Sequence, residues 1–255
     1  MNFVQVAIPS PLRQTFTYKN QFSSNLVGKR VLVEFGRRKL VGIVTSQSEN
    51  FDDDYKLKQI EEVLDDSPLI DKQLLKKIKN ISDYYMHPIG IVFESFIPSF
   101  LRKAKHQKTL EKYEIKINSD KTFNNLHTLT RDQKNVLNSI KSKDSGEILL
   151  SGITSSGKTE VYKHFIKELL NKGKSALVLV PEIFLTPQIF NDFQNTFGNK
   201  VLLNHSGLTP IQRIKVWLAS QDKNPKIIIG TRSSIFLPIS NLGGIIFDEE
   251  HDQSY

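Results

Sequence analysis

Hydrophobic and polar positions change their spacing near residue 102. Before it, apolar residues form short runs separated by turn residues, as in FVQVAIP, KRVLVEFG and KLVGIVTSQ. Short runs rich in β-branched residues predict the strands of a small sheet or barrel. Between Asp71 and Pro88, apolar residues recur three and four apart, which predicts a helix with Asp71 as its N-cap and Pro88 beyond its end. We expect 1–105 to form a small β-rich domain.

From about Leu129, apolar runs alternate with stretches of helical pattern. The expected strands are EILLS, SALVLVP, KVLLN, KIIIG and GGIIFDEE. Strands that are apolar almost throughout are buried on both faces, which crossover helices achieve in a parallel α/β sheet. The pattern therefore predicts an α/β lobe over 129–255. The stretch 106–128 is polar and basic, lacks a strong period, and is expected to be a connector.

The sequence SGITSSGKTE matches the phosphate-binding template G-x-x-x-x-G-K-[ST]. Glycines in such a loop allow backbone amides to approach phosphate oxygens at the positive end of a helix. Lys158 is expected to bind the β and γ phosphates, and Thr159 to bind Mg²⁺. A chance glycine-rich turn is the alternative, but the expected strand before it and helix after it favour a nucleotide site. The residues expected to cradle the nucleotide are Gly152, Thr154, Ser155, Ser156, Gly157, Lys158 and Thr159.

A second phosphate-side element is GGIIFDEEH, in which an apolar strand ends in acidic residues. An acid at this end of a strand can hold Mg²⁺, and we expect Asp248 to do so. Glu249 would then polarise the attacking water as a general base. Lys158, Asp248 and Glu249 form the expected catalytic set, and a solvated acidic turn is the alternative.

Composition limits the possible classes of protein. A chain of 255 residues with 38% hydrophobic content can form two domains, each with its own core. Cysteine is absent, so the sequence shown has no disulfide and no thiolate metal site. No run approaches the roughly 18 apolar residues of a membrane span, and the amino terminus does not resemble a leader. We expect a cytoplasmic protein with no membrane partner.

The formal charge of +8 and the pI near 9.4 favour polyanionic partners. This charge is unevenly distributed. Residues 1–48 contain seven Lys or Arg and one acid, whereas 49–66 contain eight acids and two lysines. A phosphate-binding surface and a solvated face are both open interpretations of this segregation.

The motifs carry a family resemblance. GITSSGKTEVY, LVLVPEIFLTPQ, HSGLT, GTRSSIFLP and DEEHDQSY, in this order, resemble the first motor lobe of the PriA family of replication-restart helicases, in superfamily 2. VAIPSPLRQTFTY, VLVEFGRRKLVGIV and YYMHPIGIVFESFIPSFLR resemble that family's 3′-end DNA-binding domain. The resemblance implies a RecA-like P-loop lobe, incomplete at its carboxyl end. It also implies the amino-terminal portion of an ATP-dependent 3′-to-5′ DNA helicase that recognises stalled or repaired forks and restarts replication through primosome assembly.

The resemblance also implies roles for single residues. Gln133 matches a glutamine that reads adenine, while Glu250 and His251 would couple the nucleotide site to DNA. The family usually has aspartate where this chain has Thr17, so the anionic acceptor for a terminal hydroxyl is missing. The segments expected to touch single-stranded DNA contain Pro181, Glu182, Thr186, Pro187, Gln188, Gly230, Thr231, Arg232 and Ser233, and the pocket for a 3′-terminal nucleotide maps to Phe16, Thr17, Gly36 and Lys58.

Purely structural roles are open for several of these residues. Thr186 and Ser233 could simply cap helices, and Phe16 could belong to the core. His205 and Ser206 match a family signature without an assigned role, and a structural histidine is an equal alternative for His205.

The resemblance is incomplete in two respects. Relatives usually insert a winged-helix module, for which 102–128 is too short. The rest of the motor, with its arginine finger and cysteine-bound zinc, would follow residue 255, so this chain alone is expected to bind ATP and Mg²⁺ but to hydrolyse ATP slowly. The implied partners are single-stranded and forked DNA, single-strand-binding protein and primosome proteins.

Two functions other than a helicase would also use a nucleotide-binding loop. A nucleotide-responsive DNA-binding module without unwinding activity is the main alternative. A GTPase or small-molecule kinase is disfavoured because no N-K-x-D segment is present.

Overall fold

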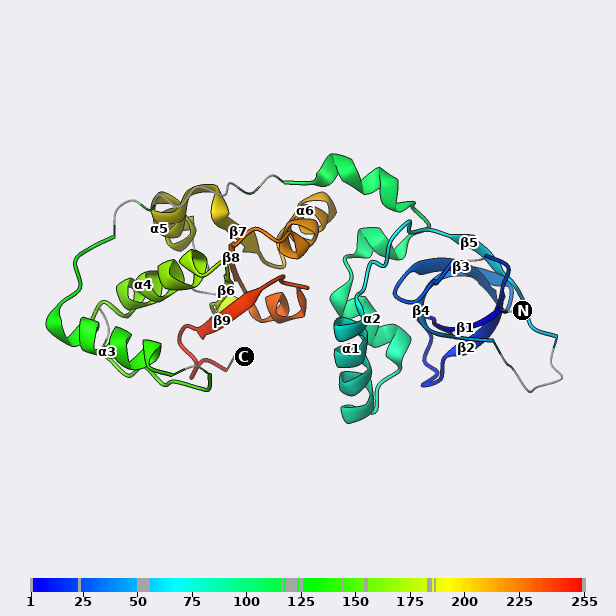
Figure 1. Ribbon diagram of the computed structural model, residues 1–255, viewed down its shortest axis with the longest axis horizontal. Coiled ribbons are helices and arrows are strands. Elements are labelled where there is room, and N and C mark those ends of the chain that lie inside the picture. The colour runs from blue at the N-terminus through cyan, green and yellow to red at the C-terminus, as the bar shows by residue number, and fades with distance from the viewer. Residues whose placement is uncertain are drawn as a thin grey trace. The chain divides into compact units, whose positions relative to one another are not determined.

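The computed structural model describes residues 2–22, 24–49, 56–115, 117, 123, 126–143, 145–153, 156–182, 185 and 187–253. The chain forms two compact units, Met1–Glu114 and Ile115–Tyr255, which are described separately (Figure 1). Residues 106–114, expected in the connector, pack with the first unit. No helix in the described parts of the chain is long and apolar enough to cross a membrane.

The first unit is built on an antiparallel sheet with the strand order β2-β1-β4-β3-β5. A bridge between Lys19 and Gln59 links β2 to the segment entering β5, so the sheet curls into a small barrel (Figure 1). The pattern predicted β1, β3 and β4, whereas the short strands β2 and β5 were not predicted. The strands are β1 (Asn2–Ala7), β2 (Phe16–Asn20), β3 (Arg30–Phe35), β4 (Arg38–Ser48) and β5 (Ile60–Val63).

Four short helical elements follow the barrel. The Asp71 carboxylate accepts a 2.7 Å hydrogen bond from Leu74 N, which confirms the predicted N-cap. Pro88 lies beyond the end of this helix and precedes the next one. The elements are α1 (Lys72–Tyr84), α2 (Ile89–Phe96) and the 3₁₀ helices η1 (Ser99–Arg102) and η2 (Gln107–Tyr113).

A buried ion pair joins the barrel to these helices. Arg30 Nη2 lies 2.6 Å from Asp65 Oδ1, and neither side chain is exposed to solvent. The same guanidinium donates to the carbonyls of Leu101, at 2.8 Å, and Lys105, at 3.1 Å. The backbone between η1 and η2 is therefore fixed to the barrel.

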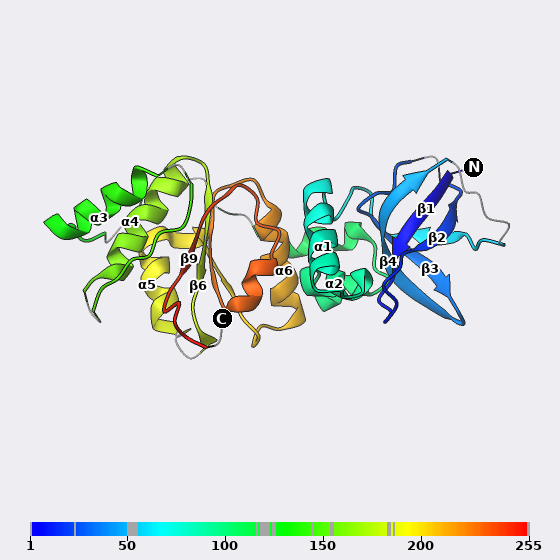
Figure 2. The ribbon, with the colours of Figure 1, turned by 90° about the horizontal axis from the view of Figure 1, so that it is seen from below.

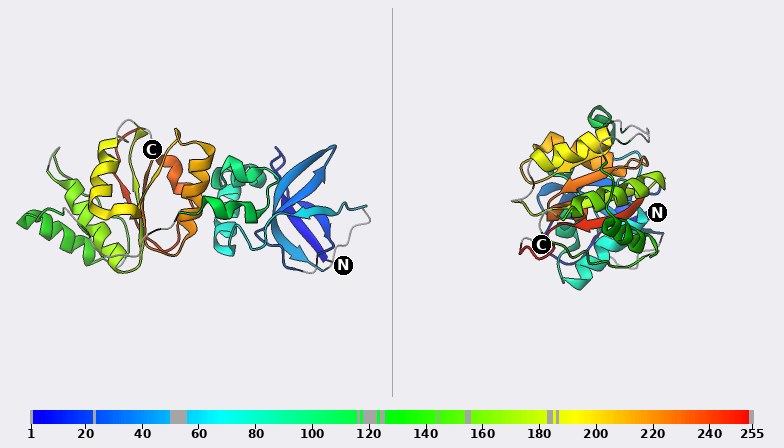
Figure 3. Two further views of the ribbon diagram at one scale, coloured as in Figure 1. Left: turned by 90° about the horizontal axis from the view of Figure 1, so that it is seen from above. Right: turned by 90° about the vertical axis from the view of Figure 1, so that its left-hand side faces the viewer.

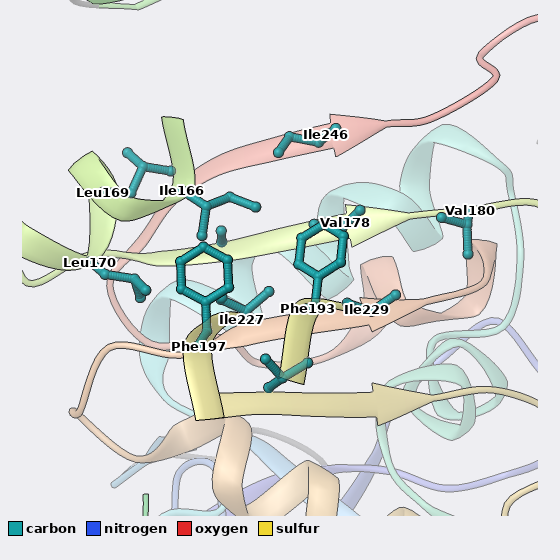
Figure 4. Close-up of a cluster of buried hydrophobic side chains, with 12 residues drawn as sticks. Ile166, Leu169, Leu170, Val178, Val180, Phe193, Phe197, Ile227, Ile229 and Ile246 are labelled. Carbon is teal, nitrogen blue, oxygen red and sulfur yellow. The ribbon is translucent and has the colours of Figure 1, made fainter. Parts of the chain in front are cut away.

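The second unit contains a parallel sheet with the order β7-β8-β6-β9. Apolar residues of α4 and α5 cover one face (Figure 4), and those of α6 cover the other. Figures 2 and 3 show α4 and α5 on one side of the sheet and α6 on the other. The elements are α3 (Arg131–Lys141), α4 (Lys158–Asn171), β6 (Ser175–Leu179), α5 (Pro187–Phe197), η4 (Gly198–Lys200), β7 (Val201–Asn204), α6 (Pro210–Gln221), β8 (Ile227–Gly230), η5 (Arg232–Phe236) and β9 (Leu242–Phe247).

One predicted strand is wrong. The segment EILLS, 147–151, is not a strand, and Leu149 within it is 77% exposed. A strand needs a neighbour to pair its backbone N–H and C=O groups. In the described part of the sheet, β9 is an edge strand and does not pair with this segment. The four other strands predicted in this unit all form.

Candidate functional site

The phosphate-binding loop leads directly into α4, which begins at Lys158. Gly157 precedes the helix with φ +81°, a left-handed conformation that side chains rarely adopt. A Cβ added to Gly157 would also lie 2.4 Å from Gln133 Nε2. The backbone conformation therefore favours glycine here, and a side chain would also displace the Gln133 amide from the loop. This position is the positive end of a helix, where anions bind.

Polar contacts hold the loop together. Lys158 Nζ donates to Gly152 O at 2.8 Å. Gln133 Nε2 donates to Ser156 O at 3.1 Å, while its Oε1 accepts from Thr130 N in the capping box of α3. The residue expected to read adenine thus contacts the loop. Thr159 is exposed in the first turn of α4, and Thr154 and Ser155 lie outside the described residues.

Asp248 lies directly after β9, and its N–H donates to Leu179 O of β6 at 2.9 Å. Burial raises the pKa of its carboxyl, and the nearby negative charge of Glu249 raises it further. The Tyr162 hydroxyl, which donates to this carboxyl, and the charge of Lys158 act against this rise in pKa. The two segments predicted to bind phosphate and metal are therefore close enough to interact electrostatically.

The residues after Asp248 form a turn. Glu249 has φ +53°, which is unusual for a residue other than glycine. Its Oε2 lies 3.6 Å from Nε2 of His251, which is 74% exposed, and Glu250 is also exposed. The expected base and one expected coupling residue are therefore neighbours.

Two loops expected to touch DNA meet at the carboxyl ends of the strands. Arg232 Nε lies 3.8 Å from Glu182 Oε1. Thr231 is buried, with Oγ1 3.5 Å from Ser233 Oγ, so its hydroxyl is partly engaged within the loop. Gln188 is exposed in the first turn of α5, and Thr186 lies outside the described residues.

The HSGLT segment is organised by local contacts. His205 Nδ1 accepts from Gly207 N at 3.1 Å, and Arg213 Nε donates to Leu208 O at 3.1 Å. These bonds favour the structural interpretation of His205.

In the first unit, three of the four expected pocket residues lie around the β3–β4 turn. Phe16 packs edge to face against Phe35, with ring centroids 4.7 Å apart. The Lys58 ammonium donates to Gly36 O at 3.2 Å. Gly36 has φ +61° and open space where a Cβ would be. Thr17 is oriented by a different partner, because its Oγ1 accepts from Gln5 Nε2 at 2.8 Å.

Three residues that contact the expected site residues of the two units were not predicted. In the second unit, Tyr162 contacts Asp248. The sequence contained a signal for Tyr162, because a residue four positions after Lys158 lies on the same face of a helix. Phe35 and Glu34 lie beside the turn, where Glu34 Oε1 is 2.7 Å from Lys58 Nζ. The positions of Phe35 and Glu34 beside the pocket depend on pairing between strands, so the local sequence carried no signal for these two residues.

Comparison with known families assigns both units. Residues 5–98 match the 3′ DNA-binding domain of PriA, and 130–255 match the DEAD/DEAH box helicase family. The replication restart protein PriA of Treponema pallidum is 32% identical over 99% of this chain. The chain belongs to the PriA family. It spans 39% of the length of that relative.

Other PriA proteins give the same picture. The protein of Rickettsia felis is 34% identical over 90% of the chain, which covers 34% of that relative. The protein of Haemophilus influenzae is 31% identical over the whole chain, which covers 45% of it. The latter alignment runs over 328 positions for 255 residues, so this relative contains at least 73 residues without a counterpart here. The Treponema alignment needs only 262 positions.

Proposed function

We propose that this chain is the nucleotide- and DNA-binding amino-terminal part of an ATP-dependent 3′-to-5′ helicase that restarts replication at stalled or repaired forks. The observation that carries the proposal is that Asp248, at the end of β9, lies close enough to Lys158 of the phosphate-binding loop for the lysine's charge to lower the pKa of its carboxyl. A P-loop lysine beside an acid at a strand end is the arrangement that phosphoryl transfer needs. A DNA-binding module that does not unwind is disfavoured because residues 130–255 match a helicase family.

The residues present suit ATP with Mg²⁺. Asp248 is a partly desolvated carboxylate beside a second acid, so its charged form would be stabilised by a cation. Carboxylate and hydroxyl oxygens are the ligands that Mg²⁺ prefers, and Asp248 and Thr159 would supply them. When bound, Mg²⁺ would neutralise charge on the phosphates. Lys158 would bind the phosphates, Gln133 would bind the base, and Glu249 would orient the attacking water.

DNA binding would involve both units. In the first unit, the ring of Phe16 would stack on a terminal base and the Lys58 ammonium would contact a phosphate. In the second, Arg232 and Gln188 would follow the backbone of a single strand without reading its bases. Single-strand-binding protein and primosome proteins are the partners expected of the whole protein, and any zinc would be bound by cysteines outside the sequence shown.

The test separates the two binding activities. Lys158→Ala should abolish binding of a fluorescent ATP analogue while leaving the affinity for a 3′-ended single strand unchanged. Lys58→Ala should weaken binding to that strand without changing nucleotide affinity, and a 3′-phosphate on the strand should mimic this loss.

Equal affinity for strands with a free 3′ hydroxyl and with a 3′-phosphate would refute recognition of the 3′ end. Undiminished nucleotide binding by Lys158→Ala would refute the nucleotide site. Strand displacement by the full-length protein on forks of either polarity tests direction.

A further inference from the structure

The segment from Arg102 to Lys112, here called the basic segment, has no part in the proposed function. It carries five lysines and arginines and one acid, Glu111. Arg102 is paired with Glu94 and His106 with Glu62. Among the described residues, the remaining four cations make no ion pair with a carboxylate. They are Lys103, Lys105, Lys108 and Lys112.

Two of these lysines belong to a continuous row of contacts. Lys105 Nζ lies 4.2 Å from the centroid of the Phe100 ring. This ring packs edge to face against Tyr113, at 5.4 Å between centroids, and Lys112 Nζ lies 5.2 Å from the Tyr113 ring. Cation–π contact holds an ammonium near a ring without neutralising its charge. The row therefore places positive charge on a defined surface.

The backbone under this row is held in place. Arg30 donates to the carbonyls of Leu101 and Lys105, and Gln107 N donates to Leu64 O at 2.8 Å. Because Arg30 is wholly buried, it attaches the basic segment to the barrel from the protein interior and leaves the outer side of the segment open to solvent. A charged surface that is already ordered loses less entropy when it binds a partner.

The basic segment differs from other lysine-rich stretches of this unit because ring contacts hold the Lys105 and Lys112 ammonium groups in place above an anchored backbone. Positive charge concentrated on an ordered surface attracts a polyanion. We propose that the basic segment binds the phosphate backbone of duplex DNA. The rings of Phe100 and Tyr113 are half-buried and already contact each other and the lysines, so they are poorly placed to stack on bases. A duplex carries one charge per about 1.7 Å of axis, a higher density than a single strand, and suits closely spaced cations. This surface lies apart in sequence from the expected 3′-end pocket and does not depend on nucleotide binding.

The test uses the 255-residue chain and two DNA probes that have no 3′ end, a duplex dumbbell closed at both ends and a circular single strand. Binding is measured over a range of salt concentrations. The first variant replaces Lys103, Lys105, Lys108 and Lys112 with Gln. The control replaces the four exposed lysines of α1, Lys72, Lys76, Lys77 and Lys79, and so makes the same change in net charge within the same unit.

The first variant should bind the dumbbell at least about tenfold more weakly and reduce the slope of log K against log salt by about 2 to 4. Control variant and wild type should have equal slopes, and Lys→Arg at the four positions should restore binding. Circular dichroism checks that each variant is folded.

An equal loss in the α1 control would indicate a general charge effect and overturn the proposal. An unchanged slope in the first variant would also overturn it. A loss confined to the circular single strand would overturn the assignment to duplex DNA. Nucleotide binding measured in parallel keeps a failure of the proposed function distinct from a failure of this surface.

Discussion

Loss of either partner of the buried ion pair between Arg30 and Asp65 is expected to destabilise the first unit strongly. In Arg30→Met, Asp65 loses its bonds to the guanidinium, and among the described residues it keeps only the 2.7 Å hydrogen bond from the backbone N of residue 30. An unpaired buried charge typically costs about 3 to 5 kcal/mol. The carbonyls of Leu101 and Lys105 also lose a donor, but we expect water to replace it, so these carbonyls add little to the loss. We expect the free energy of unfolding of this unit to fall by about 3 to 5 kcal/mol.

Hydrogen exchange measured by mass spectrometry on β3 and β4 in urea would report this loss. With a urea dependence of about 1.5 kcal/mol per molar, the midpoint for the first unit should fall by about 2 to 3 M. The fluorescence of Trp217, the single tryptophan of the chain, reports the second unit because this residue is buried there. Its transition should stay in place if the effect is confined to the first unit.

Two variants make the experiment decisive. Arg30→Met with Asp65→Leu removes the uncompensated charge and should recover much of the lost stability. Lys39→Met breaks the 2.6 Å pair with Glu61, in which Lys39 is 65% exposed, and should leave the midpoint unchanged. A loss below about 1 kcal/mol in Arg30→Met, or a double variant no more stable than the single one, would refute the reasoning.

Two further predictions concern the second unit. Gly157→Ala should lower nucleotide affinity at least about tenfold, because the new side chain strains the backbone and contacts Gln133. The control is Gly173→Ala, which is also at positive φ but has open space around it. It should leave nucleotide affinity unchanged in the same titration. Burial lowers the pKa of Lys226 from 10.5 to about 8. Because the unfolded chain binds more protons between these values, this group should raise stability as pH increases through that window. Between pH 7.5 and 9.5, wild type should gain up to about 2 kcal/mol relative to Lys226→Met, measured by Trp217 fluorescence in urea; equal pH dependence would contradict the pKa shift.

Much of the fold followed from local sequence. The N-cap at Asp71 was predictable because an acid preceding an amphipathic run satisfies free N–H groups at the start of a helix. Strands β6, β7, β8 and β9 were predictable because β-branched apolar runs suit a sheet covered on both faces. The glycine loop was also predictable, because close approach of the backbone to phosphate restricts which residues can form such a loop. The segment DEEH was predictable because an acid at the end of a strand beside that loop can hold Mg²⁺.

Tertiary structure decided what depends on partners distant in the chain. The run EILLS has the composition of a strand but is not one, because strand formation requires a neighbour and β9 does not pair with it. The contact of Tyr162 with Asp248, and the raised pKa of that acid, exist only because the sheet brings the end of β9 to α4. Arg30 and Asp65 resembled ordinary surface charges in the sequence. Burial of both side chains excludes water, so their charges must be balanced by each other. Arg30 is therefore held in one place, from which it also binds the backbone of the basic segment.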